Sequence, residues 1–362
     1  MKPLKYLFIS SMLFVATSCG NSWLDLEPST SVDTETSIKI LSDVEFTLNG
    51  IYSTMQSSDA YSGRLVYYGD VTGDDMQAVS STKRVANYYR FNFTKDDNPS
   101  SHWSYLYSII QNCNLILMNI DKLVIDEDDK AYRDDLKGEA LAIRGLALFD
   151  LTRIFGYPYL KDDGASLGVP IIEGLSTIDS KPTRNTVAQC YTKIIDDLTQ
   201  SLSLLGEKFN KGKINKWGAM VLLSRVYLYK GENANALKMA SDAIIGAEKN
   251  KYALWTNEDY PTAWGEDASA SKPGEVLFEI VNLTTDSPGK ESMGYLNSYD
   301  GYDDMCITCS FYQFLKEDPK DIRLKLLSFD KKYYAYVNKY QPQREENIDC
   351  LLYTSPSPRD RG

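Results

Sequence analysis

Histidine is nearly absent from this sequence, which has His102 as its one imidazole in 362 residues. Catalytic triads that use histidine and metal sites with several histidine ligands therefore have almost nothing to be built from. His102 stands before Trp103 at an expected helix start, where we expect a capping or solvated role rather than a catalytic one. The sequence also has no Walker A and no dinucleotide fingerprint. We therefore expect no cofactor and no histidine-based enzyme.

Cysteine is scarce, with six residues in the whole chain. Cys306 and Cys309 have the CxxC spacing of redox motifs, but they lack the βαβ context of thioredoxin and a second pair for zinc. A local disulfide and two free thiols both remain open for this pair. Cys113 and Cys190 fall on the apolar faces of expected helices, which predicts a core position. The sequence therefore predicts no metal site.

Long apolar runs are also missing after the N-terminus. Lys2 and Lys5 precede an apolar run over residues 6–15, which is too short to span a bilayer. The sequence ATSC then ends at Cys19 and is similar to a lipobox, in which the cysteine is acylated. We expect residues 1–19 to be a lipoprotein signal peptide. The alternative is a conventional signal peptide cut near Ser18, with no role for Cys19.

Basic residues are outnumbered, and the formal net charge is −11. This charge disfavours nucleic acid and anionic membrane surfaces as partners. Adjacent acids occur at Asp74/Asp75, Asp128/Asp129 and Asp303/Asp304. Glycosidases need two carboxyl groups on either side of one bond, and neighbouring acids in polar loops do not provide that arrangement. EF-hand spacing is absent too, so most of these acids are expected at the solvated surface.

A helix over residues 131–155 dominates the middle of the chain. Apolar or small residues recur at helical spacing on two of its faces, which predicts a helix packed between neighbours. Gly156 is expected to end it in the left-handed conformation, and Pro158 prevents its continuation. Apolar periodicity predicts further helices over 35–56, 103–123, 185–205, 214–229 and 233–247.

The last two of these helices form an expected hairpin around Gly231. Its pattern is that of a tetratricopeptide repeat, with Leu223, Ser224 and Tyr227 facing Ala236, Ala240 and Ala243. Such a unit needs stacked partners, and helices 131–155 and 185–205 would supply one, with residues 156–184 inserted between them. Beyond residue 251 we expect a strand over 276–281, a loop over 286–304 and a short helix over 311–321. The predicted fold is mainly α, with tetratricopeptide-like helices, long loops and a few short strands.

Aromatic residues make up 12% of the chain, and many of them lie in expected loops. An exposed ring can stack on the apolar face of a sugar, while nearby Asp, Asn or Arg side chains bond its hydroxyl groups. Each ring can equally pack underneath its loop. The rings in question are Tyr67, Tyr68, Tyr88, Tyr89, Trp255, Trp264, Tyr295, Tyr299 and Tyr302.

Several motifs together resemble one family. The helix reads AxxxRGxALFDLxRxFG and is followed by YPYL and GVPII, and YGDVTGDD precedes it. These motifs are similar to those of the SusD/RagB family, outer-membrane lipoproteins of Bacteroidota that capture nutrients. The resemblance covers residues 13–349, so we expect a SusD-like domain over 20–349. The family's Arg-Leu-x-Glu-x-Tyr-Leu helix is absent, which predicts a C-terminally truncated chain with a non-native tail over 350–362.

The resemblance implies a SusD-like α-superhelix and a lipoprotein on the cell surface, anchored in the outer membrane by Cys19. It also implies capture of a glycan or oligosaccharide, delivery to a SusC-like TonB-dependent transporter, and no enzymatic activity. By position in the family, the ligand-binding loops would be residues 61–89 and 287–304. The candidates in these loops are Arg64, Tyr88, Tyr295, Tyr299, Tyr302 and Asp303. The alternatives are a surface glycoside hydrolase and a tetratricopeptide adaptor that binds protein or peptide.

Overall fold

The computed structural model describes residues 37–94, 100–177, 179–264, 274–282, 289–330, 332, 334–340 and 350–351. The chain divides into two units, residues 1–39 and 40–362, and the helices and strands with described bounds lie in the second. The expected signal peptide, Cys19 and most of the expected tail lie outside the described residues. Among those that are described, no helix combines the length and the apolar character that crossing a bilayer requires.

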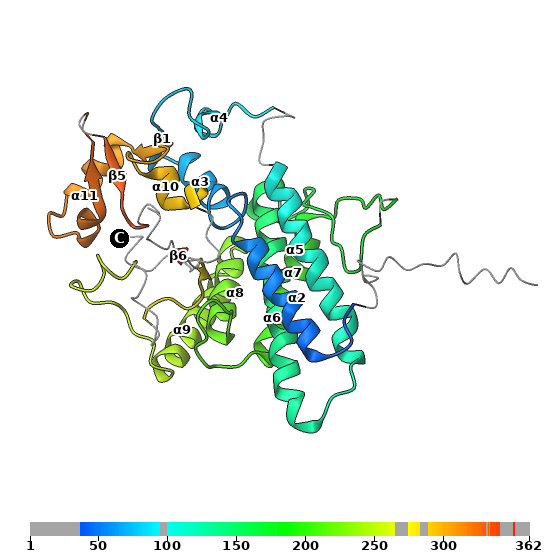
Figure 1. The fold of residues 1–362 in the computed structure, drawn as a ribbon. Coiled ribbons are helices and arrows are strands. Elements are labelled where there is room, and N and C mark those ends of the chain that lie inside the picture. Colours follow the sequence, from blue (N-terminus) through cyan, green and yellow to red (C-terminus); the bar gives the residue numbers. More distant parts are fainter. Residues whose placement is uncertain are drawn as a thin grey trace, which may run out of the picture. The chain divides into compact units, whose positions relative to one another are not determined.

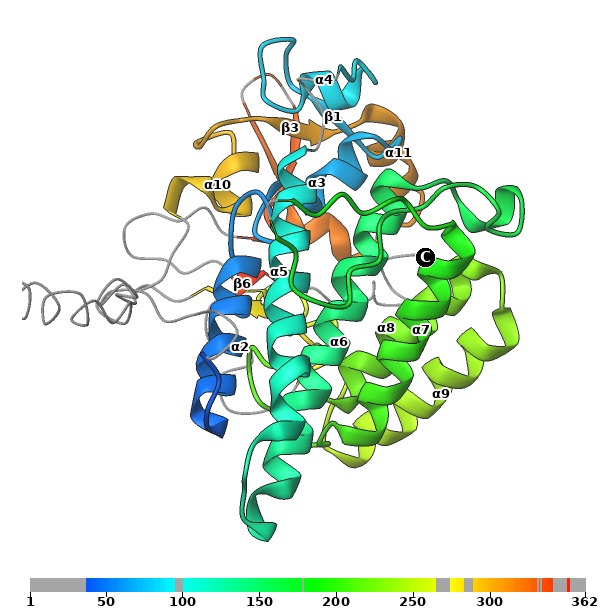
Figure 2. The ribbon, with the colours of Figure 1, turned by 90° about the vertical axis from the view of Figure 1, so that its right-hand side faces the viewer.

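The described part of the second unit is mainly helical. Its longer helices are α2 (Leu41–Met55), α5 (Ser100–Asn119), α6 (Lys130–Phe155), α7 (Val187–Leu204), α8 (Lys216–Lys230) and α9 (Asn233–Lys249). Consecutive members of this series pack against each other, and α2 also contacts α6. Figures 1 and 2 show the six helices side by side as one array. The predicted tetratricopeptide pairs, α6 with α7 and α8 with α9, are therefore confirmed.

Most of the shorter elements gather beside one end of this array (Figures 1 and 2). The helices are α3 (Arg64–Val71), α4 (Ala86–Tyr89), α10 (Met293–Asn297) and α11 (Cys309–Lys316), and the strands are β1 (Met76–Ala78), β2 (Ile280–Val281), β3 (Met305–Ile307), β4 (Leu327–Phe329), β5 (Ala335–Val337) and β6 (Cys350–Leu351). The strands form three antiparallel pairs, β1 with β3, β2 with β6 and β4 with β5. Short 3-10 turns lie at Ile120–Lys122, Glu127–Asp129, Tyr159–Lys161, Gly289–Glu291 and Ile322–Leu326.

An apolar cluster holds α3, β1, α10, β3 and β5 together. It contains Val71, Met76, Val85, Met293, Leu296, Met305, Ile307 and Ala335. Some of its members precede the long helices α5 to α9 in the sequence, and the others follow them. The loop after α2 and the loop before β3 therefore share one core. The core ties residues near position 80 to residues near position 300.

The helix α6 runs through the middle of the array and is buried along most of its length. All residues from Gly138 to Thr152 are buried, as two-faced packing requires. At Gly145 an added Cβ would come within 3.0 Å of Leu198 Cγ on α7, so the small residue is needed for the close approach of the two helices. The expectation for Gly156 is wrong, because it is extended, with φ −100° and ψ 175°. Gly231, by contrast, ends α8 in the left-handed conformation, with φ 84°.

Several other expectations need correction. The strand predicted over 276–281 is limited to Ile280–Val281, and the helix predicted over 311–321 is displaced to Cys309–Lys316. The loop expected over 286–304 contains the short helix α10. Trp255 and Trp264 are not loop rings available to a ligand, because both are buried in a second apolar cluster with Tyr260 and Val276.

Candidate functional site

The two expected binding loops come together because β1 and β3 pair. Met76 lies opposite Ile307 and Ala78 opposite Met305, and the Val79 amide donates to the Asp304 carbonyl oxygen over 3.3 Å. In an antiparallel pair, the chain leaving one strand is adjacent to the chain entering the other. Residues 79–86 therefore lie beside residues 289–304.

A group of tyrosines and charged residues forms at this junction. We call it the tyrosine cluster, and its members are Lys83, Arg84, Tyr295, Tyr299, Tyr302 and Asp303. The rings of Tyr295 and Tyr302 meet edge to face, with 5.2 Å between centroids and an interplanar angle of 83°. Tyr299 and Tyr302 keep 45% and 37% of their surface exposed. Exposed rings held by neighbours are suited to stacking against a flat apolar partner.

Arg84 joins the two loops through three contacts. Its guanidinium carbon lies 3.9 Å from the centroid of the Tyr302 ring, which is cation–π geometry. One terminal nitrogen lies 2.9 Å from Glu291 Oε2, and Nε lies 3.8 Å from Asp304 Oδ2. Burial raises the pKa of the Asp304 carboxyl, and the Arg84 charge opposes that shift. Arg84 therefore covers one face of Tyr302 and is itself neutralised by carboxylates.

The Asp303 carboxylate also holds this loop in place. The Tyr336 hydroxyl donates to its Oδ1 over 2.6 Å, and Lys83 Nζ lies 3.3 Å from its Oδ2. Lys83 also donates to the Tyr302 carbonyl oxygen over 2.6 Å. Asp303 has φ 57°, a conformation that residues other than glycine adopt rarely and mainly as Asn or Asp. The Asp303 carboxylate thus holds a tight turn beneath the exposed tyrosines.

A close backbone approach shapes the same turn. A Cβ on Gly301 would lie 2.0 Å from the Tyr295 carbonyl oxygen, which accepts from the Tyr302 amide over 3.0 Å. No side chain fits at position 301, so glycine is required there. The turn returns the chain so that the rings of Tyr295 and Tyr302 meet.

Two of the six predicted site residues make contacts elsewhere. Arg64 opens α3 and forms an ion pair with Asp59. The Tyr88 ring meets that of Tyr68 edge to face, with 5.5 Å between centroids, and packs against the shared apolar core. Tyr295, Tyr299, Tyr302 and Asp303 are the four that the structure gathers in one loop. The side chain of Tyr67 lies outside the described residues.

Lys83 and Arg84 were not predicted as site residues from the sequence. A Lys-Arg pair in a polar loop is typical of solvated surface and carries no signal of its own. Their roles depend on partners 219 and 207 positions later in the chain. Only the pairing of β1 with β3 brings them together.

The structure also places the residues that were considered for other chemistry. His102 is fully buried rather than solvated, and its Nδ1 lies 2.9 Å from the Asp59 carbonyl oxygen. Burial lowers its pKa, so it is a neutral core residue. Cys306 and Cys309 are free thiols, the first buried and the second exposed. Across the described residues, no three His, Cys, Asp or Glu side chains are grouped closely enough to hold a metal ion.

Comparison with known proteins shows which family the chain belongs to. The sequence profile of a family described as "SusD-like_3: Starch-binding associating with outer membrane" matches residues 22–228, which is more than half of the chain. The chain belongs to the SusD-like family. SusD-like protein P2 of Formosa agariphila is 28% identical over 311 residues, covering 83% of this chain and 57% of that protein. The chain thus spans little more than half the length of that relative.

Solved SusD-like structures share the fold. A candidate sugar binding protein from Bacteroides vulgatus ATCC 8482 is 82% identical, with a TM-score of 0.84 over 87% of this chain and 71% of that chain. A SusD superfamily protein from the same organism is 35% identical, with a TM-score of 0.82 over 88% of this chain and 73% of that chain. The mainly helical fold predicted from the sequence is therefore confirmed.

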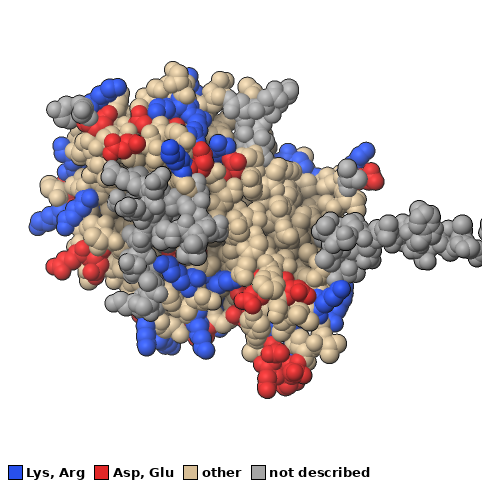
Figure 3. Space-filling model, viewed as in Figure 1, with Lys and Arg blue, Asp and Glu red and all other residues tan. Residues whose placement is uncertain are grey.

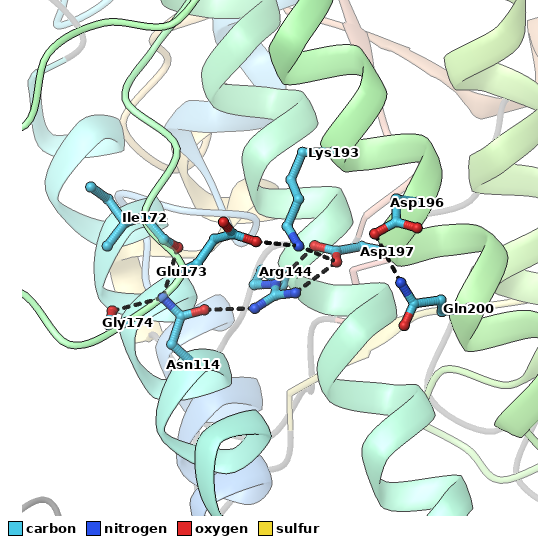
Figure 4. Close-up of polar contacts among 9 residues, drawn as sticks. All are labelled: Asn114, Arg144, Ile172, Glu173, Gly174, Lys193, Asp196, Asp197 and Gln200. Atoms are coloured by element: carbon cyan, nitrogen blue, oxygen red, sulfur yellow. Dashed lines mark hydrogen bonds and ion pairs between the residues drawn. The ribbon is translucent and has the colours of Figure 1, made fainter.

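The SusD-like motif on α6 is structural. Figure 4 shows Arg144 between α5 and α7, where its guanidinium donates to both carboxylate oxygens of Asp197 over 2.8 and 2.6 Å and to Asn114 Oδ1 over 2.8 Å. The Asn114 amide nitrogen donates in turn to the carbonyl oxygens of Ile172 and Gly174. The motif arginine therefore fastens the inserted segment 156–184 to three helices.

The second charged pair of the SusD-like motif has a similar role. Asp150 is fully buried, where it forms an ion pair with Arg153 and accepts a hydrogen bond from the Tyr61 hydroxyl over 2.8 Å. The Arg153 guanidinium also lies over the rings of Phe149 and Tyr229. The residues that reveal the family thus hold its helices together, while the tyrosine cluster lies in loops beyond them.

Proposed function

We propose that this chain binds oligosaccharides at the tyrosine cluster. The observation that carries the proposal is the pair of exposed rings, Tyr299 and Tyr302, on a turn braced by Arg84, Lys83 and Tyr336. A stacking ring costs little entropy on binding when its neighbours already hold it. The family's description, starch-binding and associated with the outer membrane, supports a sugar as the ligand.

We further propose the surroundings in which it works. The lipobox pattern ending at Cys19 and the family's description support a lipid-anchored protein of the outer membrane that faces the outside of the cell. By its resemblance to the SusD/RagB family, it would deliver captured oligosaccharides to a SusC-like TonB-dependent transporter. Co-purification of the lipidated protein with a barrel transporter tests this partner. Recovery with a soluble protein or peptide would favour the adaptor instead.

The arrangement of the carboxylates at the tyrosine cluster supports sugar binding without catalysis. A glycosidase needs two carboxyl groups that reach one glycosidic bond. At the tyrosine cluster, Asp303 already accepts from Tyr336 and pairs with Lys83, and Asp304 is 2% exposed. Purified protein should release no oligosaccharides from any polysaccharide that it binds. Hydrolysis that persists through repurification would establish the hydrolase instead.

Substitution of both exposed rings tests the binding site. Each stacked ring contributes about 0.5–1.5 kcal/mol beyond simple burial, so we expect Tyr299→Ala with Tyr302→Ala to weaken glycan binding roughly tenfold or more. Calorimetry with a polysaccharide found by a binding screen measures the loss. Tyr132→Ala on α6 is the matched control, because Tyr132 is 42% exposed and lies outside the cluster. Unchanged affinity in a double variant with a normal melting curve would exclude this site.

A further inference from the structure

Arg84 and Lys83, the two cations that contact Tyr302, are each paired with carboxylates, and Lys290 Nζ lies 5.9 Å from the Tyr295 ring centroid as a third cation nearby. Arg84 lies 2.9 Å from Glu291 and 3.8 Å from Asp304, and Lys83 lies 3.3 Å from Asp303. Lys83 also donates to the Tyr302 carbonyl oxygen. Figure 3 shows the same balance at larger scale, since basic and acidic groups alternate over the region of β1 and α10. Tyr302 therefore stands among compensated charges.

An anionic sugar would meet obstacles at such a surface. Its carboxylate or sulfate would have to displace Glu291 from Arg84, or Asp303 from Lys83, before it gained a cation. Until then it would face the carboxylates of Glu291 and Asp303, and like charges brought together oppose association. The formal charge of −11 adds repulsion of polyanions at longer range.

An uncharged sugar meets none of these obstacles. The carboxylates of Glu291 and Asp303 keep further lone pairs beside their protein partners and can accept from sugar hydroxyl groups without changing partners. The exposed parts of Tyr299 and Tyr302 can contact the C–H surface of a pyranose ring. Neither contact requires an ion pair of the cluster to open.

We propose that the tyrosine cluster selects uncharged oligosaccharides over those that bear uronic acid or sulfate groups. The inference rests on the proposed function, because it describes the ligand of the same site. It adds that Glu291, Asp303 and Asp304 set the specificity by compensating Lys83 and Arg84, which would otherwise attract an anionic sugar.

Matched pairs of glycans provide the test on the full-length protein. Each pair shares a backbone and differs in charge: methyl-esterified and free oligogalacturonide, plain and glucuronic-acid-bearing xylo-oligosaccharide, and plain and sulfated galactan oligosaccharide. We expect binding to an uncharged member, weakened by Tyr302→Ala, and at least tenfold weaker binding to its charged counterpart. Because no ion pair with the ligand is formed, affinity for the uncharged member should change less than about twofold between about 20 and 300 mM NaCl.

Variants of one carboxylate test the cause. Glu291→Gln leaves Arg84 less compensated. It should therefore reduce the ratio of the affinities for uncharged and charged ligands, here called the affinity gap, several-fold. Glu127→Gln removes the same charge at a site that is 82% exposed and lies outside the cluster, so it should leave the gap unchanged. An equal gap in the two variants would contradict the role of Glu291.

These measurements distinguish failure of the charge selectivity from failure of the proposed sugar binding. A charged glycan that binds as tightly as its uncharged counterpart, and that loses affinity with Tyr302→Ala, overturns the selectivity and leaves the sugar site intact. A folded protein that binds neither member of any pair, nor any polysaccharide in the screen, overturns the proposed function and the selectivity with it.

Discussion

Glu139 on α6 is a carboxyl group in a place that disfavours its charge. Its side chain is 6% exposed, and the Tyr52 hydroxyl donates to its Oε2 over 2.6 Å. Burial raises its pKa from 4.5 to about 7, against the opposing effects of Tyr52 and Lys213. Between these two values the folded chain holds a proton that the unfolded chain has lost. Stability from this group is therefore greatest at low pH and declines as the pH rises through about 7.

Replacing Glu139 should remove that decline. From the difference between the two pKa values, wild-type protein should lose roughly 3 kcal/mol of unfolding free energy through this group between pH 4.5 and pH 8. Glu139→Gln keeps an acceptor for Tyr52 and cannot ionise, so its stability should depend less steeply on pH. Urea denaturation at several pH values measures both curves, with exposed Glu127→Gln as the control. Parallel curves for wild type and Glu139→Gln would show that Glu139 ionises normally.

Among the helices, the contact of α8 with α9 depends on one glycine. A Cβ at Gly246 would lie 2.1 Å from an atom of the Trp217 indole, and Trp217 is itself buried. The large side chain of one helix thus enters a space that the small residue of the other leaves open. This is the complementarity that the tetratricopeptide pattern predicts, at a pair of positions that the pattern did not single out.

Alanine at two helical glycines should give opposite effects. Gly246→Ala forces Trp217 to move, and overpacking of this kind costs about 1–3 kcal/mol. Gly50 lies in α2 with nothing within 4 Å of an added Cβ, so Gly50→Ala should stabilise the protein by about 0.5–1 kcal/mol through helix propensity. Urea midpoints of the two variants measure the contrast. Equal destabilisation by both would mean that α8 and α9 do not pack as described.

How far an element could be predicted depended on its length. The long helices follow from apolar periodicity and begin and end within a few residues of expectation in most cases. Gly156 was misjudged because sequence shows that a helix can end there, not which backbone conformation ends it. The bounds of the short elements α10, α11 and β2 depend on tertiary contacts, so α11 and β2 could be predicted only approximately and α10 was not predicted. The cluster was predicted in part, since its tyrosines stand out in loops but Lys83 and Arg84 do not.

At the scale of the whole protein, the proposed function depends on attachment of the chain to the outer membrane. A single acyl chain gives marginal membrane binding, whereas two or more give stable anchoring. If Cys19 carries the anchor, the protein stays with the membrane in spite of its net charge of −11, which disfavours adsorption to anionic lipid. Its attachment would then depend on one thiol.

Removal of that thiol should release the protein. We expect Cys19→Ser to move it from the outer-membrane fraction to the soluble periplasmic fraction, because no acyl chain can be attached. Fractionation followed by immunoblotting measures the shift. Cys309→Ser removes a different exposed thiol and should leave the protein in the membrane fraction. A Cys19→Ser protein that still sediments with outer membrane would exclude Cys19 as the anchor.

The Arg144 network also constrains how the protein folds. The carboxylate that neutralises Arg144 belongs to Asp197, 53 residues later in the chain. Until Asp197 is in place, α6 cannot be buried without enclosing an uncompensated guanidinium, which is strongly unfavourable. The helices α5 and α6 must therefore wait for α7, and the three are expected to fold in one cooperative step.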